Sequence, residues 1–95
     1  MKRALLPVAL ALVAAVAATA EPHSYELYVP AVQCSYSSAR AQDLVDEGAP
    51  VIRVRADARA HKLSIRLDDS KISIEAVTAL LTDNGYPVTE TRLVR

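Results

Sequence analysis

The chain contains a single cysteine, no tryptophan and no phenylalanine. One cysteine cannot form a disulfide within its own chain, so the sequence excludes a disulfide-stapled mini-protein. There is no excess of charge of either sign, because 11 basic residues balance 11 acidic ones. This balance argues against a strongly basic nucleic-acid-binding protein. With 95 residues, the chain has room for one small domain, which excludes a multidomain enzyme.

Glycine is also scarce, with only two residues, Gly48 and Gly85. Each is expected at the end of a helix, so the sequence offers no glycine-rich phosphate-binding loop. Several serines follow the cysteine in sequence (Ser35, Ser37 and Ser38), but no histidine is placed by sequence to activate them as nucleophiles. The sequence therefore predicts a protein that is not an enzyme.

The first twenty residues have the three parts of a secretory signal peptide. A basic start (Met1–Arg3) precedes an uncharged run rich in alanine, leucine and valine, and small residues stand at Ala18 and Ala20. An uncleaved membrane anchor is the alternative, although the run is shorter than the ~20 strongly apolar residues of a spanning helix. We expect residues 1–20 to be a signal peptide and residues 21–95 to be a periplasmic or secreted domain without a stable membrane anchor. Cleavage removes the only methionine, so the mature chain has no thioether ligand.

Residues 21–95 show two kinds of hydrophobic period. Alternation of apolar and polar residues predicts strands at 24–32, 51–56, 62–67 and 88–94. Helical spacing predicts one helix from Ser37 or Ser38 to Glu47 and another from Ser73 to Asn84. The order strand-helix-strand-strand-helix-strand is typical of the ferredoxin-like fold, an α+β sandwich. We expect a four-stranded antiparallel sheet with both helices on one face.

Each element has an apolar set that should form the core. These sets are Tyr25, Leu27, Val29 and Ala31; Ala41, Leu44 and Val45; Ile52, Val54 and Ala56; Leu63, Ile65 and Leu67; and Ile74, Val77, Leu80 and Leu81. The other face of the sheet should carry Arg53, Arg55, Ser64 and Arg66, which we interpret as a solvated surface.

The predicted topology places three loops at one end of the sheet. They carry Cys34, His61 and Tyr86 respectively, although these residues are far apart in sequence. His23 is expected at the opposite end of the sheet. The Asp68–Asp69 pair is interpreted as a strand-to-helix turn rather than a site for a hard cation.

Residues 21–95 resemble the heavy-metal-associated domain family, which includes exported mercury-binding proteins and cytosolic copper chaperones. The resemblance rests on the order of the elements and on Cys34 at the end of the first strand. It also rests on the segments Leu67–Lys71 and Asn84–Val88, and the Gly-Tyr-Pro sequence is especially similar to exported mercury-binding members. It implies binding of a soft metal ion, Cu(I) or Hg(II), by a protein with a metal transporter or another soft-metal protein as its partner.

Members of this family bind the ion between two cysteines in a G-M-x-C-x-x-C loop. Here that loop reads Ala-Val-Gln-Cys-Ser-Tyr-Ser, so Cys34 matches the first ligand and Ser37 occupies the second position. A serine hydroxyl is a poor ligand for a soft ion. The second ligand must then come from Cys34 of another chain in a homodimer, from a partner's thiolate or from His61. The resemblance also implies that Tyr36 shapes the rim of the site and that Tyr86 covers it.

Two alternatives to a metal carrier remain open at this point. The first is a metal-free protein-interaction module, in which Cys34 is a small buried hydrophobic residue. The second is a mixed disulfide formed by Cys34 with a partner or with a second copy. The sequence does not choose between copper and mercury.

Overall fold

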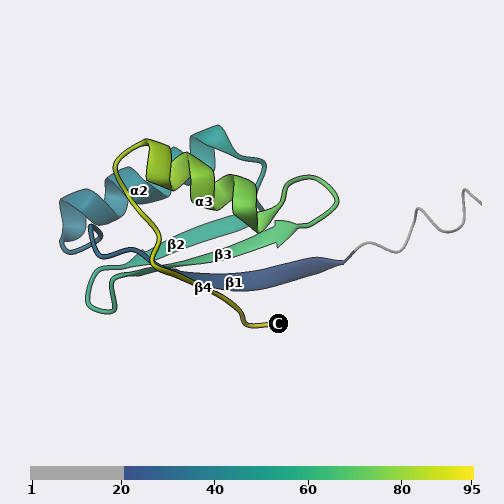
Figure 1. Ribbon diagram of the computed structural model, residues 1–95, viewed down its shortest axis with the longest axis horizontal. Helices are drawn as coiled ribbons and strands as arrows, with labels where there is room; N and C mark the ends of the chain where they lie inside the picture. Colours follow the sequence, from purple (N-terminus) through teal and green to yellow (C-terminus); the bar gives the residue numbers. More distant parts are fainter. Residues whose placement is uncertain (1–20) are drawn as a thin grey trace, which may run out of the picture.

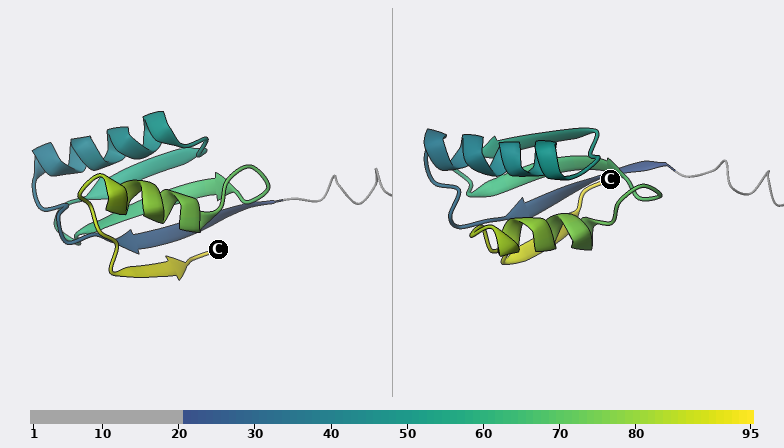
Figure 2. Two further views of the ribbon diagram at one scale, coloured as in Figure 1. Left: turned by 45° about the horizontal axis from the view of Figure 1, so that its top comes forward. Right: turned by 90° about the horizontal axis from the view of Figure 1, so that it is seen from above.

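The computed structural model describes residues 21–95, and the predicted signal peptide at 1–20 lies outside the described residues. The elements are β1 (Pro22–Tyr28), α2 (Ser35–Gly48), β2 (Arg53–Asp57), β3 (Lys62–Asp68), α3 (Ile74–Asp83) and β4 (Glu90–Leu93) (Figure 1). The strands form one sheet in the order β2-β3-β1-β4, and every neighbouring pair is antiparallel. Both helices lie on the same face of this sheet (Figure 2). The predicted ferredoxin-like sandwich is confirmed.

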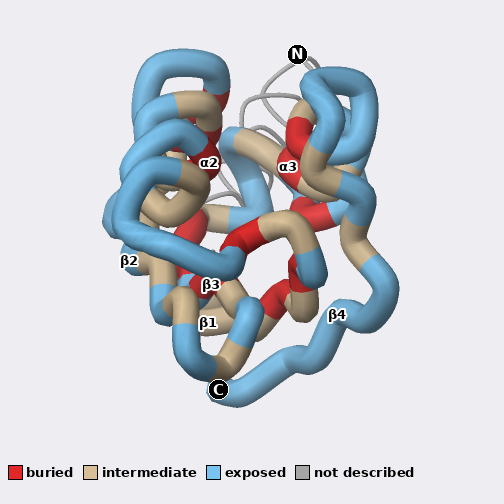
Figure 3. The backbone as a smooth tube through the Cα atoms, turned by 90° about the vertical axis from the view of Figure 1, so that its left-hand side faces the viewer, coloured by how far each residue is buried: buried red, intermediate tan, exposed pale blue. Residues whose placement is uncertain are grey.

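The core lies between the helices and the sheet, where the buried residues gather (Figure 3). Strand alternation puts one face of β1 and β3 inward, and the register sets Leu27 opposite Leu63. Fully buried side chains come from β1, β3, both helices and the loop after β1: Leu27, Val29, Val32, Val45, Leu63, Ile65, Leu67, Val77 and Leu81. All six elements and this core lie within residues 21–95.

Three predicted core residues lie outside the observed core. Ala31 and Leu44 are only partly buried and are not among the residues that form the core or pack against it. Ile52 is 56% exposed, because β2 begins only at Arg53 and Ile52 lies in the bend before it. Val54 and Ala56 keep the predicted face and pack against the core. The predicted ends of β1 and β4 also lie beyond the observed ends. β1 stops at Tyr28 instead of Val32 because the chain turns there, and the turn is closed by a hydrogen bond from Val32 N to Val29 O at 2.9 Å.

The two glycines stand at the helix ends, as predicted. Gly85 adopts φ +90°, which strains any residue with a Cβ. Gly48 is the last residue of α2, and a Cβ there would lie 2.9 Å from Leu80 Cδ2 on α3. The absence of a side chain at Gly48 therefore allows the two helices to pack closely.

The start of α3 was predicted correctly, but the start of α2 was not. The Ser73 hydroxyl caps α3 by accepting Ala76 N–H at 3.1 Å. In contrast, α2 begins at Ser35 with Cys34 as its N-cap, about one turn earlier than the predicted cap at Ser37 or Ser38. The helix begins earlier because Ser37 lies inside its first turn, where the Ser37 hydroxyl accepts the backbone N–H groups of Gln33 and Cys34.

β4 is the least enclosed strand. All four of its residues are exposed, and it is shorter than the predicted 88–94. Thr89 N–H donates to Tyr28 O at 2.9 Å just before it begins. Arg92 contacts Glu26 at 2.9 Å across the sheet.

Within residues 21–95, neither helix has the length and apolar character that a membrane span needs.

Candidate functional site

The loop after β1 is fastened to the β2–β3 hairpin. His61 Nδ1 lies 2.9 Å from Val32 O, and His61 O accepts Val29 N–H at 2.7 Å. His61 itself adopts φ +54°, the left-handed conformation that lets a hairpin of this kind close. The structure thus brings His61 to the loop that leads into Cys34, at the end of the sheet that the sequence predicted.

Cys34 is exposed and lies at the N-terminus of α2. Its backbone is extended, with φ −152° and ψ 176°, as expected for an N-cap residue. Cys34 and Ser37 form a reciprocal capping box, in which the sulfur faces the backbone N–H of Ser37 and the Ser37 hydroxyl faces the backbone N–H of Cys34. The metal-free hypothesis placed this thiol in the core, and its exposure contradicts that placement.

The pKa of Cys34 is lowered from its ordinary value of 9.0. The largest cause is the backbone N–H of Ser37, followed by the Ser37 hydroxyl and the backbone N–H of Tyr36. These groups stabilise the thiolate by donating hydrogen bonds to it, as helix N-termini do for anions. The thiolate is the nucleophilic and metal-binding form of cysteine, so the local structure favours the reactive form.

Ser37 holds the loop together. Its hydroxyl oxygen accepts backbone N–H groups from Gln33 at 2.9 Å and from Cys34 at 3.1 Å. The same hydroxyl lies 3.2 Å from Cys34 O and 3.5 Å from Cys34 Sγ, and its single hydrogen can be donated to either of these acceptors. The residue that stands at the second ligand position of the resembled motif therefore has a structural role here. Sequence analysis did not predict this role. The signal for it is the spacing: Ser37 stands three residues after Cys34, as the two residues of a capping box do.

His61 keeps one ring nitrogen for a further partner. A carbonyl oxygen can only accept, so Nδ1 must carry the proton that it shares with Val32 O. In the neutral imidazole with this tautomer, Nε2 is the nitrogen that carries the lone pair. No hydrogen bond joins His61 to the sulfur of Cys34 in the described part of the chain, where Ser37 is the side-chain partner of that sulfur.

The two tyrosines near this end differ in their surroundings. Tyr36 is 72% exposed and stands two residues after the thiol. Tyr86 is half-buried and packs against the core beyond α3. Its backbone N–H donates to Leu81 O at 2.8 Å, which fixes the loop after that helix. Coverage of the thiol by Tyr86 stays a prediction.

Sequence reasoning missed a hollow of about 250 Å³ at the same end of the sheet. It is lined by Tyr28, Val29, Pro30, Ala60, His61 and Thr89, and Cys34 is not among these residues. The hollow arises because β1 and the hairpin both end here.

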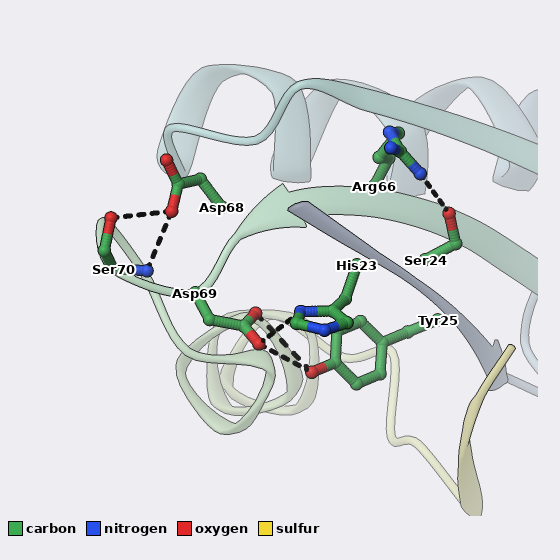
Figure 4. A network of polar contacts seen from close by, with 7 residues as sticks. All are labelled: His23, Ser24, Tyr25, Arg66, Asp68, Asp69 and Ser70. Carbon is green, nitrogen blue, oxygen red and sulfur yellow. Dashed lines mark hydrogen bonds and ion pairs between the residues drawn. The ribbon is translucent and has the colours of Figure 1, made fainter. Parts of the chain in front are cut away.

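The remaining titratable cluster lies at the opposite end of the sheet, as predicted for His23 (Figure 4). His23 Nδ1 is 2.9 Å from Asp69 Oδ2, and the Tyr25 hydroxyl donates to the same carboxylate oxygen at 3.2 Å. Asp68 accepts Ser70 N–H at 2.9 Å, which makes the predicted turn.

Among residues 21–95, no group of three histidine, cysteine or carboxylate side chains converges in a way that could hold a metal ion.

The sequence matches no protein-family model and no curated protein. Several solved structures share its fold. The oxidized form of MerP from Ralstonia metallidurans CH34 has a TM-score of 0.67 at 24% identity, covering 74% of this chain and 100% of that one. The CopZ metallochaperone has a TM-score of 0.64 at 19% identity, covering 70% and 98%. The mercury-bound form of MerP, a periplasmic protein of bacterial mercury detoxification, has a TM-score of 0.61 at 20% identity, covering 79% and 100%. The resemblance to heavy-metal-associated domains is confirmed at the level of the fold.

Proposed function

We propose that this chain is an exported carrier or buffer of a soft metal ion, Cu(I) or Hg(II), which it binds through the thiolate of Cys34. The observation that carries the proposal is the exposed thiol at the N-terminus of α2, where neighbouring N–H groups lower its pKa. Soft ions select thiolates over the oxygen and nitrogen ligands that predominate elsewhere on this chain. The fold shared with a mercury-bound protein and a metallochaperone supports the same assignment.

The number of thiolates determines the form of the complex. One chain offers one thiolate and no thioether outside residues 1–20. The Ser37 hydroxyl is already engaged by two backbone N–H groups. The second soft ligand therefore comes from another molecule: Cys34 of a second copy, or a thiolate of a metal transporter or another soft-metal protein that exchanges the ion. We assign His61 an accessory role, because Nε2 is its free nitrogen near this loop.

Export is the second part of the proposal. It rests on the composition of residues 1–20, which have the basic start, the apolar run and the small-residue end of a signal peptide. In the periplasm or outside the cell, thiols tend to be oxidised. A bound soft ion would protect a lone thiolate from oxidation there, which fits a carrier or a buffer better than a catalyst.

The test is a competition titration of reduced residues 21–95 with Cu(I) against a chromophoric chelator, together with native mass spectrometry. The proposal expects one Cu(I) per two chains and loss of binding in Cys34→Ala. His61→Ala serves as the comparison: it should weaken binding only if Nε2 is a ligand. Binding of one ion per chain that survives Cys34→Ala would move the site away from α2. No competition at all would contradict the carrier function.

A protein-interaction module that binds no metal is the second candidate, favoured by the 72% exposure of Tyr36 at the loop beside the thiol. Exposed aromatic side chains are enriched where proteins bind partners. The same titration separates the two candidates. A module without metal would compete for no Cu(I), and its Cys34 would react with alkylating agents at the same rate with and without Cu(I).

A further inference from the structure

The open face of the sheet, opposite the helices, is hollowed. A depression of about 200 Å³ lies there. It is lined by three arginines, Arg53 and Arg55 on β2 and Arg66 on β3. Ser24 on β1 and Ser64 on β3 also line it. Arg66 is held in place by a hydrogen bond from Nη1 to Ser24 Oγ at 2.9 Å (Figure 4). The sequence predicted a solvated surface here and did not anticipate a concave one.

The acidic residue in this hollow is already neutralised by other bases. Glu26 accepts hydrogen bonds from Lys62 at 3.1 Å and from Arg92 at 2.9 Å. No ion pair in the described part of the chain involves any of the three arginines. The positive charge at the β2 side of the hollow is therefore uncompensated.

This arrangement is unfavourable for the free protein. The register places Arg53 directly opposite Arg66 on adjacent antiparallel strands. Opposed residues on such strands have Cα atoms about 4.5 to 5.5 Å apart, and like charges in that position destabilise a sheet. Stability of the sheet does not explain the opposed pair Arg53 and Arg66, whereas a bound anion would remove the repulsion between them.

We propose that this hollow binds a small, multiply charged oxyanion, of the class of phosphate or polycarboxylate compounds, between Arg53, Arg55 and Arg66. Guanidinium groups bind such oxygens through paired N–H donors. Ser24 Oγ accepts from Arg66, so its own hydrogen remains available to a ligand oxygen. The Ser64 hydroxyl, directly opposite Arg55 in the register, supplies a further donor.

The shape and charge of the hollow favour a small ligand over a membrane. A depression of about 200 Å³ fits a compact molecule, whereas a flat anionic surface cannot enter it. A membrane lying across the whole face would also meet the carboxylate of Glu90 on β4. Cys34 is not among the lining residues, so this site is independent of the proposed metal carrier.

The test is an NMR titration of ¹⁵N-labelled residues 21–95 with sodium pyrophosphate at low ionic strength, in metal-free buffer. The proposal expects saturable shifts centred on the amides of Ser24, Arg53, Arg55, Ser64 and Arg66. The double variant Arg53→Gln/Arg55→Gln should weaken binding by at least roughly tenfold, since two charge-assisted contacts are lost. The matched control is Arg40→Gln/Arg59→Gln, which removes the same charge from exposed positions on α2 and in the hairpin.

Two further measurements complete the test. The single variant Arg53→Gln should lower pyrophosphate affinity while raising the denaturant midpoint, because it removes the repulsion from Arg66. The proposal is wrong if shifts do not saturate, if equimolar chloride reproduces them, or if the control variant weakens binding as much as the double variant. Binding to vesicles of anionic phospholipid without saturable pyrophosphate binding would also overturn it. Because metal is absent throughout, none of these outcomes bears on the role of Cys34.

Discussion

The Ser37 hydroxyl lies 3.5 Å from the Cys34 sulfur and accepts the backbone N–H of the same cysteine at 3.1 Å. One side chain thus both shapes the loop and stabilises the thiolate. A second cysteine at this position would give the loop two thiols, but it would lose the hydroxyl that now fastens two backbone N–H groups. This pair of residues leads to the first three predictions.

Replacing Ser37 with alanine should have two effects. It removes the second-largest cause of the lowered pKa of Cys34, so the pKa should rise part of the way toward 9.0 while the backbone N–H groups keep some of the shift. It should also destabilise the fold by about 1 kcal/mol through the lost loop hydrogen bonds. The measurements are the pH dependence of alkylation and a denaturant titration. Ser35→Ala is the control, and an equal effect in that variant would contradict the assigned role of Ser37.

The lowered pKa of Cys34 also makes stability depend on pH. Because the thiolate is favoured in the folded state, its contribution is fully present above the unfolded pKa and is lost as the pH falls through the folded pKa. The difference in denaturant midpoint between the native chain and Cys34→Ala should therefore grow as the pH rises toward 9 and then level off. A difference that does not change with pH would show that the thiolate is not stabilised by α2.

Replacing Ser37 with cysteine should change the stoichiometry of metal binding. Two thiolates on one loop can hold a soft ion without a second chain, so we expect one Cu(I) per chain instead of one per two chains. Native mass spectrometry of the reduced variant reads this number directly. The control is Ser38→Cys, which adds a thiol one residue further along α2. If both variants bind identically, the loop does not determine the ligand geometry.

The two leucines of α3 should differ in their contribution to stability. Leu81 is fully buried, whereas Leu80 is partly buried and faces Gly48. Leu81→Ala should destabilise the domain by about 2 to 5 kcal/mol, and Leu80→Ala by less. Denaturant titrations of both variants measure the difference, with Leu93→Ala, at an exposed position, as the control. A larger loss for Leu80→Ala than for Leu81→Ala would contradict the placement of α3.

The carboxylate of Glu26 should make the edge strand β4 sensitive to acid. Hydrogen bonds from Arg92, and then from Lys62, lower the pKa of Glu26 below its ordinary value of 4.5. Its contribution to stability is therefore present above pH 4.5 and is lost as the pH falls through the folded pKa. Glu26→Gln should lose less stability on acidification and should show faster amide exchange in β4 at neutral pH. Glu47→Gln, at an exposed position on α2, should show neither change.

The sequence predicted the architecture well because the apolar periods of the strands and helices are set by which face is buried. Leu63, Ile65 and Leu67 alternate in sequence and are all buried in the structure. The errors fall where several residues could perform the same task. Three serines follow Cys34, and only tertiary contacts decide that the cysteine is the N-cap and Ser37 the third helical residue. The sequence also did not predict the ion pairs of Glu26 with Lys62 and Arg92, since they depend on the pairing of β1 with both β3 and β4.

Both ends of the described chain leave the sheet on the side away from the thiol. Pro22 pairs with Asp68, and the backbone of Arg95 is hydrogen-bonded to that of Ser24, whereas Cys34 follows the opposite end of β1. A linker attached at either end would therefore be held away from the sulfur. The domain can be coupled to an electrode or a bead in a fixed orientation with its thiol facing the solution, as a sensor for thiophilic ions requires.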